Sequence, residues 1–366
     1  MSDPILENAF IESLARGLPR SPQQLNRLQE ADAELVRIPG TTAVLALKTD
    51  TLVEEIETGL YRDPSLLGWM TVTVNASDLA AVGAEPFGLL LNETLPASVD
   101  PSFVAQLQGG IADACAAYGF AVLGGDTNFS PHMQLGAFAV GLIPDGKPVT
   151  RMGAHAGDRL FASGPLGIGG AFALATLQQG ADGAAPPGNR PPYRPLARIR
   201  EGVALRPHAS SCMDSSDGVL PTLDQLSRLN GIGFRLDGPL DAILHPAAAA
   251  SARASGIPPW MYLAGPHGEF ELLFTVPPDR VAAFIASAET IDWRPLPIGV
   301  VTAEAGVTLP FGAEWRAVDT GKVRNLYPES EGNVSKYVAG LLEMHAVLSR
   351  GPAAAAVDVD RPDAAP

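Results

Sequence analysis

The residues best suited to chemistry in this sequence are aspartates that follow apolar segments. They occur at four places and comprise Asp50, Asp78, Asp126 and the pair Asp214 and Asp217. Each of them alone also fits a helix cap or a turn, because aspartate accepts hydrogen bonds from nearby backbone amides. Several carboxylates brought together would repel one another unless cations lay between them. A converging set would therefore bind Mg²⁺, which prefers hard oxygen ligands and commonly bridges carboxylates to phosphates.

Two glycine-rich segments offer backbone amides to a phosphate. They are "GGDT" at 124–127 and "SGPLGIGGA" at 163–171, the second placed ahead of a predicted helix. Arg151, at the junction between the two halves of the chain, could also reach a phosphate. The sequence contains no GxxxxGK[ST] motif, and each glycine segment also fits an ordinary turn.

The elements expected to position these residues alternate between strands and helices. In the first half, apolar patterning predicts strands at 42–50, 87–96, 120–125 and 133–143, and helices at 4–17, 23–35, 64–84 and 102–119. "GGDTN" is then expected to be a glycine turn where a buried strand ends. This order predicts an α/β sandwich with helices on one face of a sheet.

The pattern restarts beyond Arg151. Strand, glycine loop and helix are predicted over 157–177, a helix at 197–205, strand, turn and helix over 210–231, and a strand at 268–276. Proline and glycine are frequent in 178–195, which predicts a mobile loop, and 350–366 lacks a burial pattern and is expected to be disordered. The length favours two domains, with a boundary near 145–151.

Composition narrows the class of protein. The chain has 366 residues, is 46% hydrophobic and carries a formal charge of −15, which argues against a nucleic-acid or membrane-surface partner. Two cysteines, Cys115 and Cys212, are expected to be buried free thiols. The first residues lack the basic and apolar regions of a signal peptide, and no apolar run is long enough to cross a bilayer. A cytoplasmic protein is expected.

Seven short segments resemble, in order and spacing, the thiamine-monophosphate kinase family, a branch of the AIR synthase (PurM-like) superfamily. The resemblance covers roughly residues 35–305. The segments are "KTDTLVEE", "GWMTVTVNASDLAAVGAEP", "GGDT", "RMGAHAGDRLFASGPLG", "YRPLARIREGVAL", "MDSSDG" and "GEFELLFT".

This resemblance implies a PurM-like two-domain fold of class α/β plus α+β. The N-terminal domain pairs its sheet with that of a second copy in a homodimer, and the C-terminal domain is an α+β sandwich. The expected parts are a helical extension at 1–34, the ATP- and Mg²⁺-binding domain at 35–148, the second domain at 149–310, a C-terminal extension at 311–349 and the disordered tail at 350–366.

The resemblance also implies the cofactors ATP and Mg²⁺ and a set of site residues. The metal ligands would be Thr49 (through its backbone carbonyl), Asp50, Asp78, Asp126, Asp214 and Asp217. The ATP site would use Gly125, Asp126, Arg151 and Ser216. Phosphoryl transfer depends on positioning and neutralised charge more than on a protein nucleophile, so no acid or base residue is assigned.

The sequence departs from the family mainly around the acceptor. "PGTTA" at 39–43 stands where the kinases are expected to carry "GDDAA", which predicts the loss of a metal position. "VEEIETG" replaces "VEGVHF" and places Glu57 near a substrate-binding histidine, and "HGEFEL" replaces "GEDYEL" and leaves Glu269 or Glu271 for the substrate. "GGDTNFS" replaces "GGDTTRG" and loses an arginine.

Three functions follow. The first is an ATP-dependent kinase whose partners are ATP and a small-molecule acceptor, thiamine phosphate or a relative. The second is an AIR synthase-like ligase or cyclase, which activates an amide or carboxyl oxygen as a phosphate ester before an amine displaces it. The third is a non-catalytic nucleotide-binding protein, suggested only by the missing "GDDAA". The products ADP and inorganic phosphate distinguish them.

Overall fold

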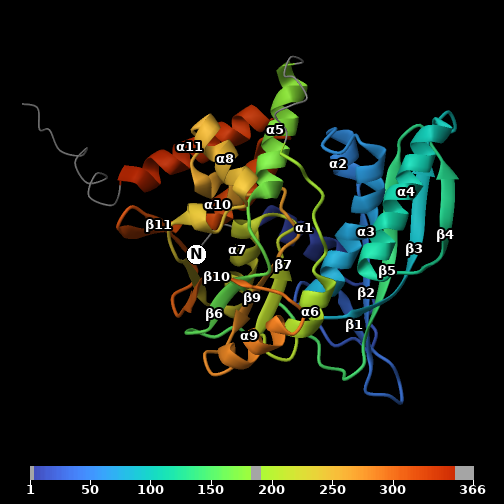
Figure 1. Ribbon diagram of the computed structural model, residues 1–366, viewed down its shortest axis with the longest axis horizontal. Helices are drawn as coiled ribbons and strands as arrows, with labels where there is room; N and C mark the ends of the chain where they lie inside the picture. Colours follow the sequence, from blue (N-terminus) through green and yellow to red (C-terminus); the bar gives the residue numbers. More distant parts are fainter. Residues whose placement is uncertain (1–3, 183–190, 351–366) are drawn as a thin grey trace, which may run out of the picture.

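The computed structural model describes residues 4–182 and 191–350 and contains two β-sheets with helices around and between them (Figure 1). The helices are α1 (Leu6–Ala15), α2 (Val53–Glu57), α3 (Pro64–Ala81), α4 (Pro101–Tyr118), α5 (Ile168–Asp182), α6 (Ile199–Leu205), α7 (Val219–Asn230), α8 (Pro246–Ser255), α9 (Val281–Glu289), α10 (Thr320–Glu329) and α11 (Val334–Arg350). The strands are β1 (Glu34–Arg37), β2 (Val44–Thr51), β3 (Glu85–Leu95), β4 (Val122–Phe129), β5 (Gln134–Ile143), β6 (Arg159–Ala162), β7 (Ser211–Asp214), β8 (Gly233–Leu236), β9 (Leu272–Val276), β10 (Leu296–Thr302), β11 (Gly306–Phe311) and β12 (Glu314–Val318).

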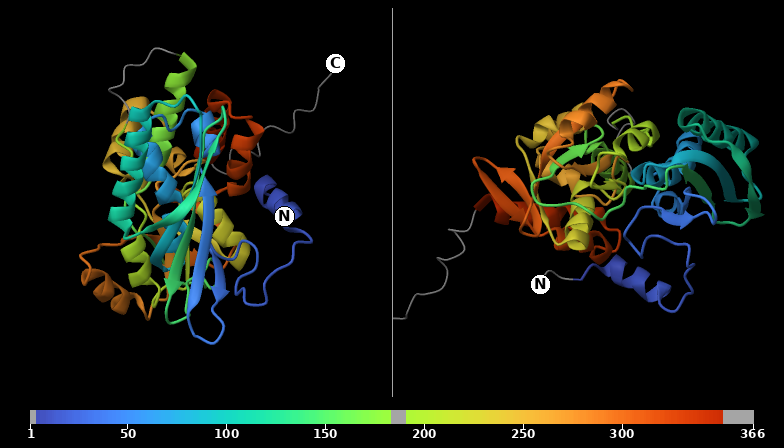
Figure 2. Two further views of the ribbon diagram at one scale, coloured as in Figure 1. Left: turned by 90° about the vertical axis from the view of Figure 1, so that its right-hand side faces the viewer. Right: turned by 90° about the horizontal axis from the view of Figure 1, so that it is seen from below.

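The first sheet has the strand order β1-β2-β5-β3-β4. Its neighbours are antiparallel except β3 and β4, which run parallel and are joined through α4. Helices α3 and α4 cover one face, and the other face is open, as Figure 2 (left) shows with the strands in front. Every residue of the edge strand β4 is exposed. The predicted α/β arrangement with helices on one sheet face is confirmed.

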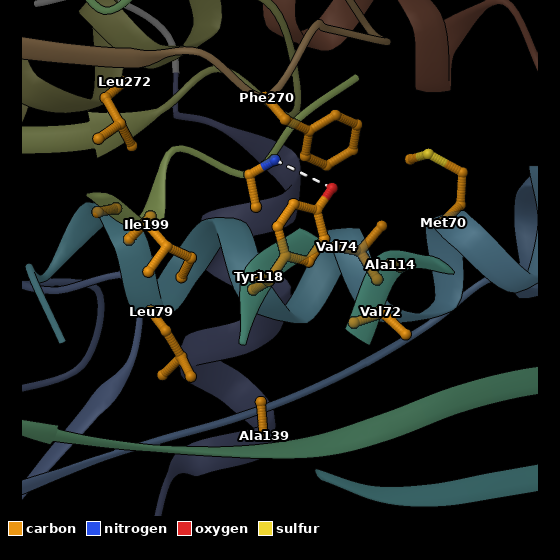
Figure 3. Close-up of a cluster of buried hydrophobic side chains, with 14 of the residues drawn as sticks. Met70, Val72, Val74, Leu79, Ala114, Tyr118, Ala139, Ile199, Phe270 and Leu272 are labelled. Carbon is orange, nitrogen blue, oxygen red and sulfur yellow. Dashed lines mark hydrogen bonds between the residues drawn. The ribbon is translucent and has the colours of Figure 1, made fainter. Parts of the chain in front are cut away.

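The second sheet has the order β12-β11-β8-β10-β6-β9-β7, with only β11 and β8 parallel. Helix α3 lies between the two parts of the molecule, because it contacts α4, β2 and β5 on one side and α6 and β7 on the other. Figure 3 shows Leu79 of α3 between Ala139 of β5 and Ile199 of α6. Fifteen of the 18 residues of α3 are buried, so a polar residue on this helix sits deep in the protein.

Close contact between α3 and α4 depends on two glycines. A Cβ atom on Gly68 would meet the carbonyl oxygen of Leu107 at 2.0 Å, and one on Gly110 would meet that of Ser65 at 2.0 Å. Asp63 caps α3 by accepting a hydrogen bond from the Leu66 amide at 2.7 Å. The helix is thereby held in place at its beginning and along one side.

The helix predicted at 23–35 is wrong. Gln24 forms a β-bridge with Val36, and β1 begins at Glu34. Polar side chains replace the helical backbone bonds, since Asn26 accepts from the Leu35 amide at 2.9 Å and Glu30 accepts from the Arg27 amide at 2.7 Å. The segment is therefore a set of turns ahead of β1.

The glycine turn predicted at "GGDTN" is also wrong, because β4 continues through it to Phe129. Gly125 pairs with Leu91 of β3, and a Cβ atom on Gly125 would meet the Leu91 carbonyl oxygen at 2.2 Å. Glycine is needed here so that β4 can approach β3 closely.

Other predictions were confirmed or only partly described. Cys115 and Cys212 are buried and free. Of the loop predicted at 178–195, residues up to Asp182 belong to α5, and 183–190 lie outside the described residues, as does 351–366 of the predicted tail. Among the described helices, none combines the length and the hydropathy needed to cross a membrane.

Candidate active site

Three aspartates from different parts of the chain meet beside α3. Asp78 lies on α3, Asp214 ends β7, and Asp32 precedes β1. All three are buried, and one carboxylate oxygen from each lies within 4.8 Å of the others. We call these three residues the aspartate cluster. It brings the two sequence-predicted ligands Asp78 and Asp214 together with Asp32, which the sequence analysis had placed in a helix.

Two cationic side chains contact the cluster. The Lys48 Nζ atom lies 3.1 Å from Asp78 Oδ2 and 3.8 Å from Asp50 Oδ2, and Arg151 Nη2 lies 2.9 Å from Asp32 Oδ1. Burial alone would lower the pKa of Lys48, but its attraction to Asp78 and Asp50 outweighs burial, so the pKa is raised and the ammonium is retained. Burial raises the pKa of Asp78 well above its usual range, with Lys48 opposing that shift.

Strand β2 aims Lys48 and Asp50 at the cluster. Alternate residues of a strand share a face, so both point the same way as the buried Val44 and Ala46, toward α3. Thr49 lies on the opposite, open face, where its hydroxyl donates to the Ala137 carbonyl at 3.0 Å. Only the backbone of Thr49 is therefore left for the predicted metal contact.

Hydroxyl groups orient Asp214. Ser77 donates to Asp214 Oδ2 at 2.6 Å, and Ser216 donates to Asp214 Oδ1 at 2.9 Å. By contrast, Asp32 Oδ2 is buried without a hydrogen-bond partner among the described residues. A buried carboxylate oxygen without a donor is costly unless a cation or water meets it. The donor set and this unpaired oxygen fit a bound Mg²⁺ ion.

The position of Asp32 corrects the expectation drawn from "PGTTA". That segment, 39–43, is an exposed to half-buried turn before β2 and does not reach the cluster. The acidic residue ahead of the "TD" strand is Asp32 instead, held by Arg151, whose backbone amide also donates to the Glu30 carbonyl at 2.9 Å. An aspartate is thus kept at this end of the site. The signal available in the sequence was "EADAEL", which resembles an acidic motif shifted from its expected place.

A cavity of about 310 Å³ has Asp217, three residues after the cluster residue Asp214, in its lining. Helices α2, α5 and α10 and residues 264–267 form its walls. Its charged and aromatic lining residues include Glu54, Glu55, Asp217, His267, Arg324 and Tyr327. Asp217 lies close enough to the cluster for the charge of Asp214 to raise its pKa. Carboxylates outnumber cationic groups on these walls.

Two carboxylates of the cavity, Glu55 and Asp217, have raised pKa values. Burial raises the pKa of Glu55 to about 7, and the charges of Asp50 and Glu54 add to the shift. The surrounding protein raises the pKa of Asp217 to about 7 as well, mainly by desolvation and then through Glu7 and Asp214, although its side chain is exposed toward the cavity. A cation entering the cavity would stabilise the ionised form of both.

The N-terminal segment closes one side of the cavity. Ile5 and Glu7 belong to the lining. The Leu6 amide donates to Asn325 Oδ1 at 3.1 Å, and Asn325 Nδ2 donates to the Pro4 carbonyl at 3.0 Å. The beginning of α1 is thus fastened to α10, and residues from both ends of the chain complete the cavity.

Asp126 lies apart from the cluster within one chain. Gly125 shares a row with Leu91, Ala137 and Asp50 across the first sheet, so three strand spacings separate β4 from β2, or about 14 Å. Asp126 itself pairs with the exposed Asn92 and faces the open side of the sheet. It accepts a hydrogen bond from Asn128 at 2.7 Å. The five predicted aspartates therefore do not converge in a single copy.

The glutamates predicted to contact substrate lie in different surroundings. Glu57 is exposed and does not line the cavity, which its neighbours Glu54 and Glu55 do. Glu269 is buried and accepts from the Gly167 amide at 2.7 Å and from Ser215. Glu271 is buried and pairs with Arg198. The substrate role of all three remains a prediction.

The comparisons with known proteins identify the family of this chain. Residues 30–143 match the family model "AIR synthase related protein, N-terminal domain", which begins just before Asp32. Thiamine-monophosphate kinase of Escherichia coli (strain K12) is 36% identical over 251 residues, which cover 67% of this chain and 75% of that protein. The enzyme of the same name from Caulobacter vibrioides is 30% identical, with 83% of this chain and 86% of that protein covered.

A solved structure gives the same result in three dimensions. "AaThiL complexed with AMPPCP and TMP" superposes with a TM-score of 0.66 at 25% identity, covering 82% of this chain and 91% of that one. The PurM-like fold expected from the sequence is thereby confirmed, and so is the kinase type of activity. Aspartates that could hold a metal ion near a cavity are compatible with such an ATP-dependent phosphotransferase. The chain belongs to the thiamine-monophosphate kinase family of AIR synthase-related proteins.

Proposed function

We propose that this enzyme transfers a phosphoryl group from Mg²⁺-bound ATP to a small cationic acceptor, thiamine monophosphate or a close relative. The observation that carries the proposal is the aspartate cluster next to the acidic cavity, joined by the short link from Asp214 to Asp217. A donor phosphate held at the cluster and an acceptor held in the cavity would lie on either side of that link. Such positioning is the main requirement of phosphoryl transfer.

The residues of the cluster would hold the metal. Asp32, Asp78 and Asp214 supply carboxylate oxygens, and the unpaired Asp32 Oδ2 supports a cation at this place. A bound Mg²⁺ would neutralise the charge of the phosphates. Ser77 and Ser216 fix the Asp214 carboxylate, and Arg151 fixes that of Asp32. The predicted contact of Arg151 or Ser216 with ATP phosphates would have to coexist with these bonds.

The cavity supports a cationic acceptor. Glu54, Glu55 and Asp217 line it, with Arg324 as the cationic side chain. AMPPCP and TMP are the molecules named for the solved relative. Thiamine carries a cationic thiazolium ring, which acidic and aromatic walls attract, and Arg324 is available for an acceptor phosphate.

A homodimer is part of the proposal, because Asp126 cannot reach the cluster of its own chain. A second copy packed against the edge strand β4 would cover apolar side chains that are now exposed, among them Val122, Leu123 and Phe129. It could also bring its Gly125 and Asp126 toward the cluster of the first copy. The predicted ligand Asp126 would then act across the interface.

Product analysis tests the reaction. With ATP, Mg²⁺ and thiamine monophosphate, we expect equal amounts of ADP and thiamine diphosphate and no inorganic phosphate. Inorganic phosphate formed together with a cyclised or amidated product would favour a ligase or cyclase instead. Nucleotide binding without any ADP from a panel of cationic acceptors would contradict catalysis.

Mixed dimers test the shared site. Chains carrying Asp126→Asn and chains carrying Asp78→Asn are co-expressed with different tags, and heterodimers are isolated. Each homodimer should be inactive, whereas a heterodimer contains one site with an intact cluster and an intact Asp126 from the other copy. About half of the wild-type turnover is expected per dimer. Inactive heterodimers would contradict a site shared between copies.

A further inference from the structure

Lys48 occupies an unusual position for a lysine. Its ammonium group contacts both Asp78 and Asp50 from β2, and its side chain is three-quarters buried. Surface ion pairs contribute little to stability, but this lysine enters a group of carboxylates that also includes Asp32 and Asp214. The Lys48 ammonium therefore changes the net charge of the group of carboxylates.

The formal charges of these side chains indicate how many divalent cations the site would bind. Asp32, Asp50, Asp78 and Asp214 bring four negative charges, whereas Lys48 and Arg151 bring two positive ones. The remaining charge of minus two is balanced by a single divalent cation. Without Lys48, the charge would be minus three and a second divalent cation would be favoured.

We propose that Lys48 is a resident cation that takes the place of one divalent ion at the cluster. Its ammonium bridges Asp78 and Asp50, so one of their two negative charges is balanced in the absence of a second metal. The ion that the cluster does bind is left to the side of Asp32 and Asp214, where Asp32 Oδ2 has no partner among the described residues. Lys48 is thus a positioning residue that sets how many metal ions the site accepts and where they bind.

Mn²⁺ titration tests the inference, which rests on the proposed metal site. Bound Mn²⁺ is counted by electron paramagnetic resonance of the free ion, with the purified full-length protein and without ATP. Lys48→Met keeps the length and apolar stem of the side chain and removes its charge. We expect this variant to bind one more Mn²⁺ per chain than the wild type, or to bind Mn²⁺ at least about tenfold more tightly. Lys48→Arg retains the charge and should keep the wild-type stoichiometry.

Lys147→Met is the matched control, because Lys147 is an exposed lysine in the turn after β5, away from the cluster. It should bind Mn²⁺ as the wild type does. If Lys48→Met is unfolded without metal, Mn²⁺ should restore its fold, as measured by circular dichroism, because the ion replaces the missing charge. An unfolded variant that Mn²⁺ does not rescue would overturn the inference.

Two further results separate the possible failures. Unchanged Mn²⁺ binding in folded Lys48→Met would overturn the role of Lys48, and so would a loss of ATP affinity with no gain of Mn²⁺, since Lys48 would then be a phosphate ligand. A wild-type protein that binds no Mn²⁺ would instead contradict the metal site on which the proposed function depends.

Discussion

The aspartate cluster and the neighbouring cavity are both acidic, but their carboxylates have different partners. Lys48, Arg151 and two serines hold the cluster carboxylates in fixed positions. In the cavity, Glu55 and Asp217 have raised pKa values. In the proposed function, the cluster would hold a metal–phosphate group, and a cationic molecule entering the cavity would balance the charge of its carboxylates. In that proposal, the cluster serves the reaction of ATP and the cavity selects the acceptor.

The largest effect should come from removing one cluster carboxylate. Asp32→Asn is expected to lower kcat for ATP-dependent turnover at least about a hundredfold and to weaken Mn²⁺ binding, because an amide carries no charge for the metal. It also leaves Arg151 without its anionic partner, so the free energy of unfolding should fall by about 1–3 kcal/mol. Steady-state kinetics and urea unfolding measure the two effects.

The control for this variant is Asp63→Asn, at the N-cap of α3. Asparagine caps helices about as well as aspartate, so activity and stability should stay near the wild-type values. If Asp32→Asn retains full turnover, Asp32 is not a metal ligand and the cluster cannot be the centre of the reaction.

A substitution at the contact between α3 and α4 should lower the free energy of unfolding more than one on the exposed side of α4. Gly68→Ala places a methyl group against the Leu107 carbonyl oxygen and should force α3 away from α4, at a cost of about 2–4 kcal/mol in the free energy of unfolding. Gly109→Ala, on the exposed side of α4, meets no described atom within 4 Å and should be neutral or stabilising by up to about 1 kcal/mol. Equal stability of the two variants in chemical denaturation would contradict the observed packing of α3.

The acceptor cavity can be changed without altering the cluster. Glu55→Gln should raise KM for thiamine monophosphate about tenfold at pH 8 and leave KM for ATP unchanged, because one negative charge facing the cationic acceptor is lost. The pKa of Glu55 is raised to about 7 by burial, so the wild-type residue is mostly neutral at pH 6 and the effect should shrink there.

Glu57→Gln is the matched comparison for the cavity, because Glu57 is exposed and outside the lining. We expect it to change KM less than twofold, an effect typical of a distant surface charge. The opposite ranking of the two variants would favour the substrate residue predicted from the sequence over the cavity.

The last prediction concerns the stability of the protein and the buried residue Glu269. Burial raises its pKa to about 8, with Glu271 adding to the shift. Because the folded-state pKa is higher than the unfolded one, this residue stabilises the protein at low pH, and that contribution is lost as pH rises from about 4.5 to about 8. Glu269→Gln should abolish this loss, about 2 kcal/mol after relaxation of the protein is allowed for. Parallel slopes of unfolding free energy against pH in both proteins would refute the shift.

The sequence alone determined the order of elements and the family. Apolar runs and helix caps are local features, so β2, α3, β3, α4 and β5 could be predicted with small errors at their ends. Asp78 and Asp214 could also be predicted as parts of one site, because each follows a distinctive short segment. Predictions failed at 23–35 and at 124–128, where side-chain hydrogen bonds and strand pairing, not local propensity, set the backbone.

Only the tertiary structure decided which charges meet. Asp32, Lys48 and Arg151 come from different segments of the chain, and no spacing in the sequence shows that they meet at one site with Asp78. The sheet register likewise puts Asp126 on the open face, away from Asp50. The cavity is closed by residues from both ends of the chain. Charge balance depends on distances of a few ångströms across the fold, and these distances exist only once the helices and sheets have packed.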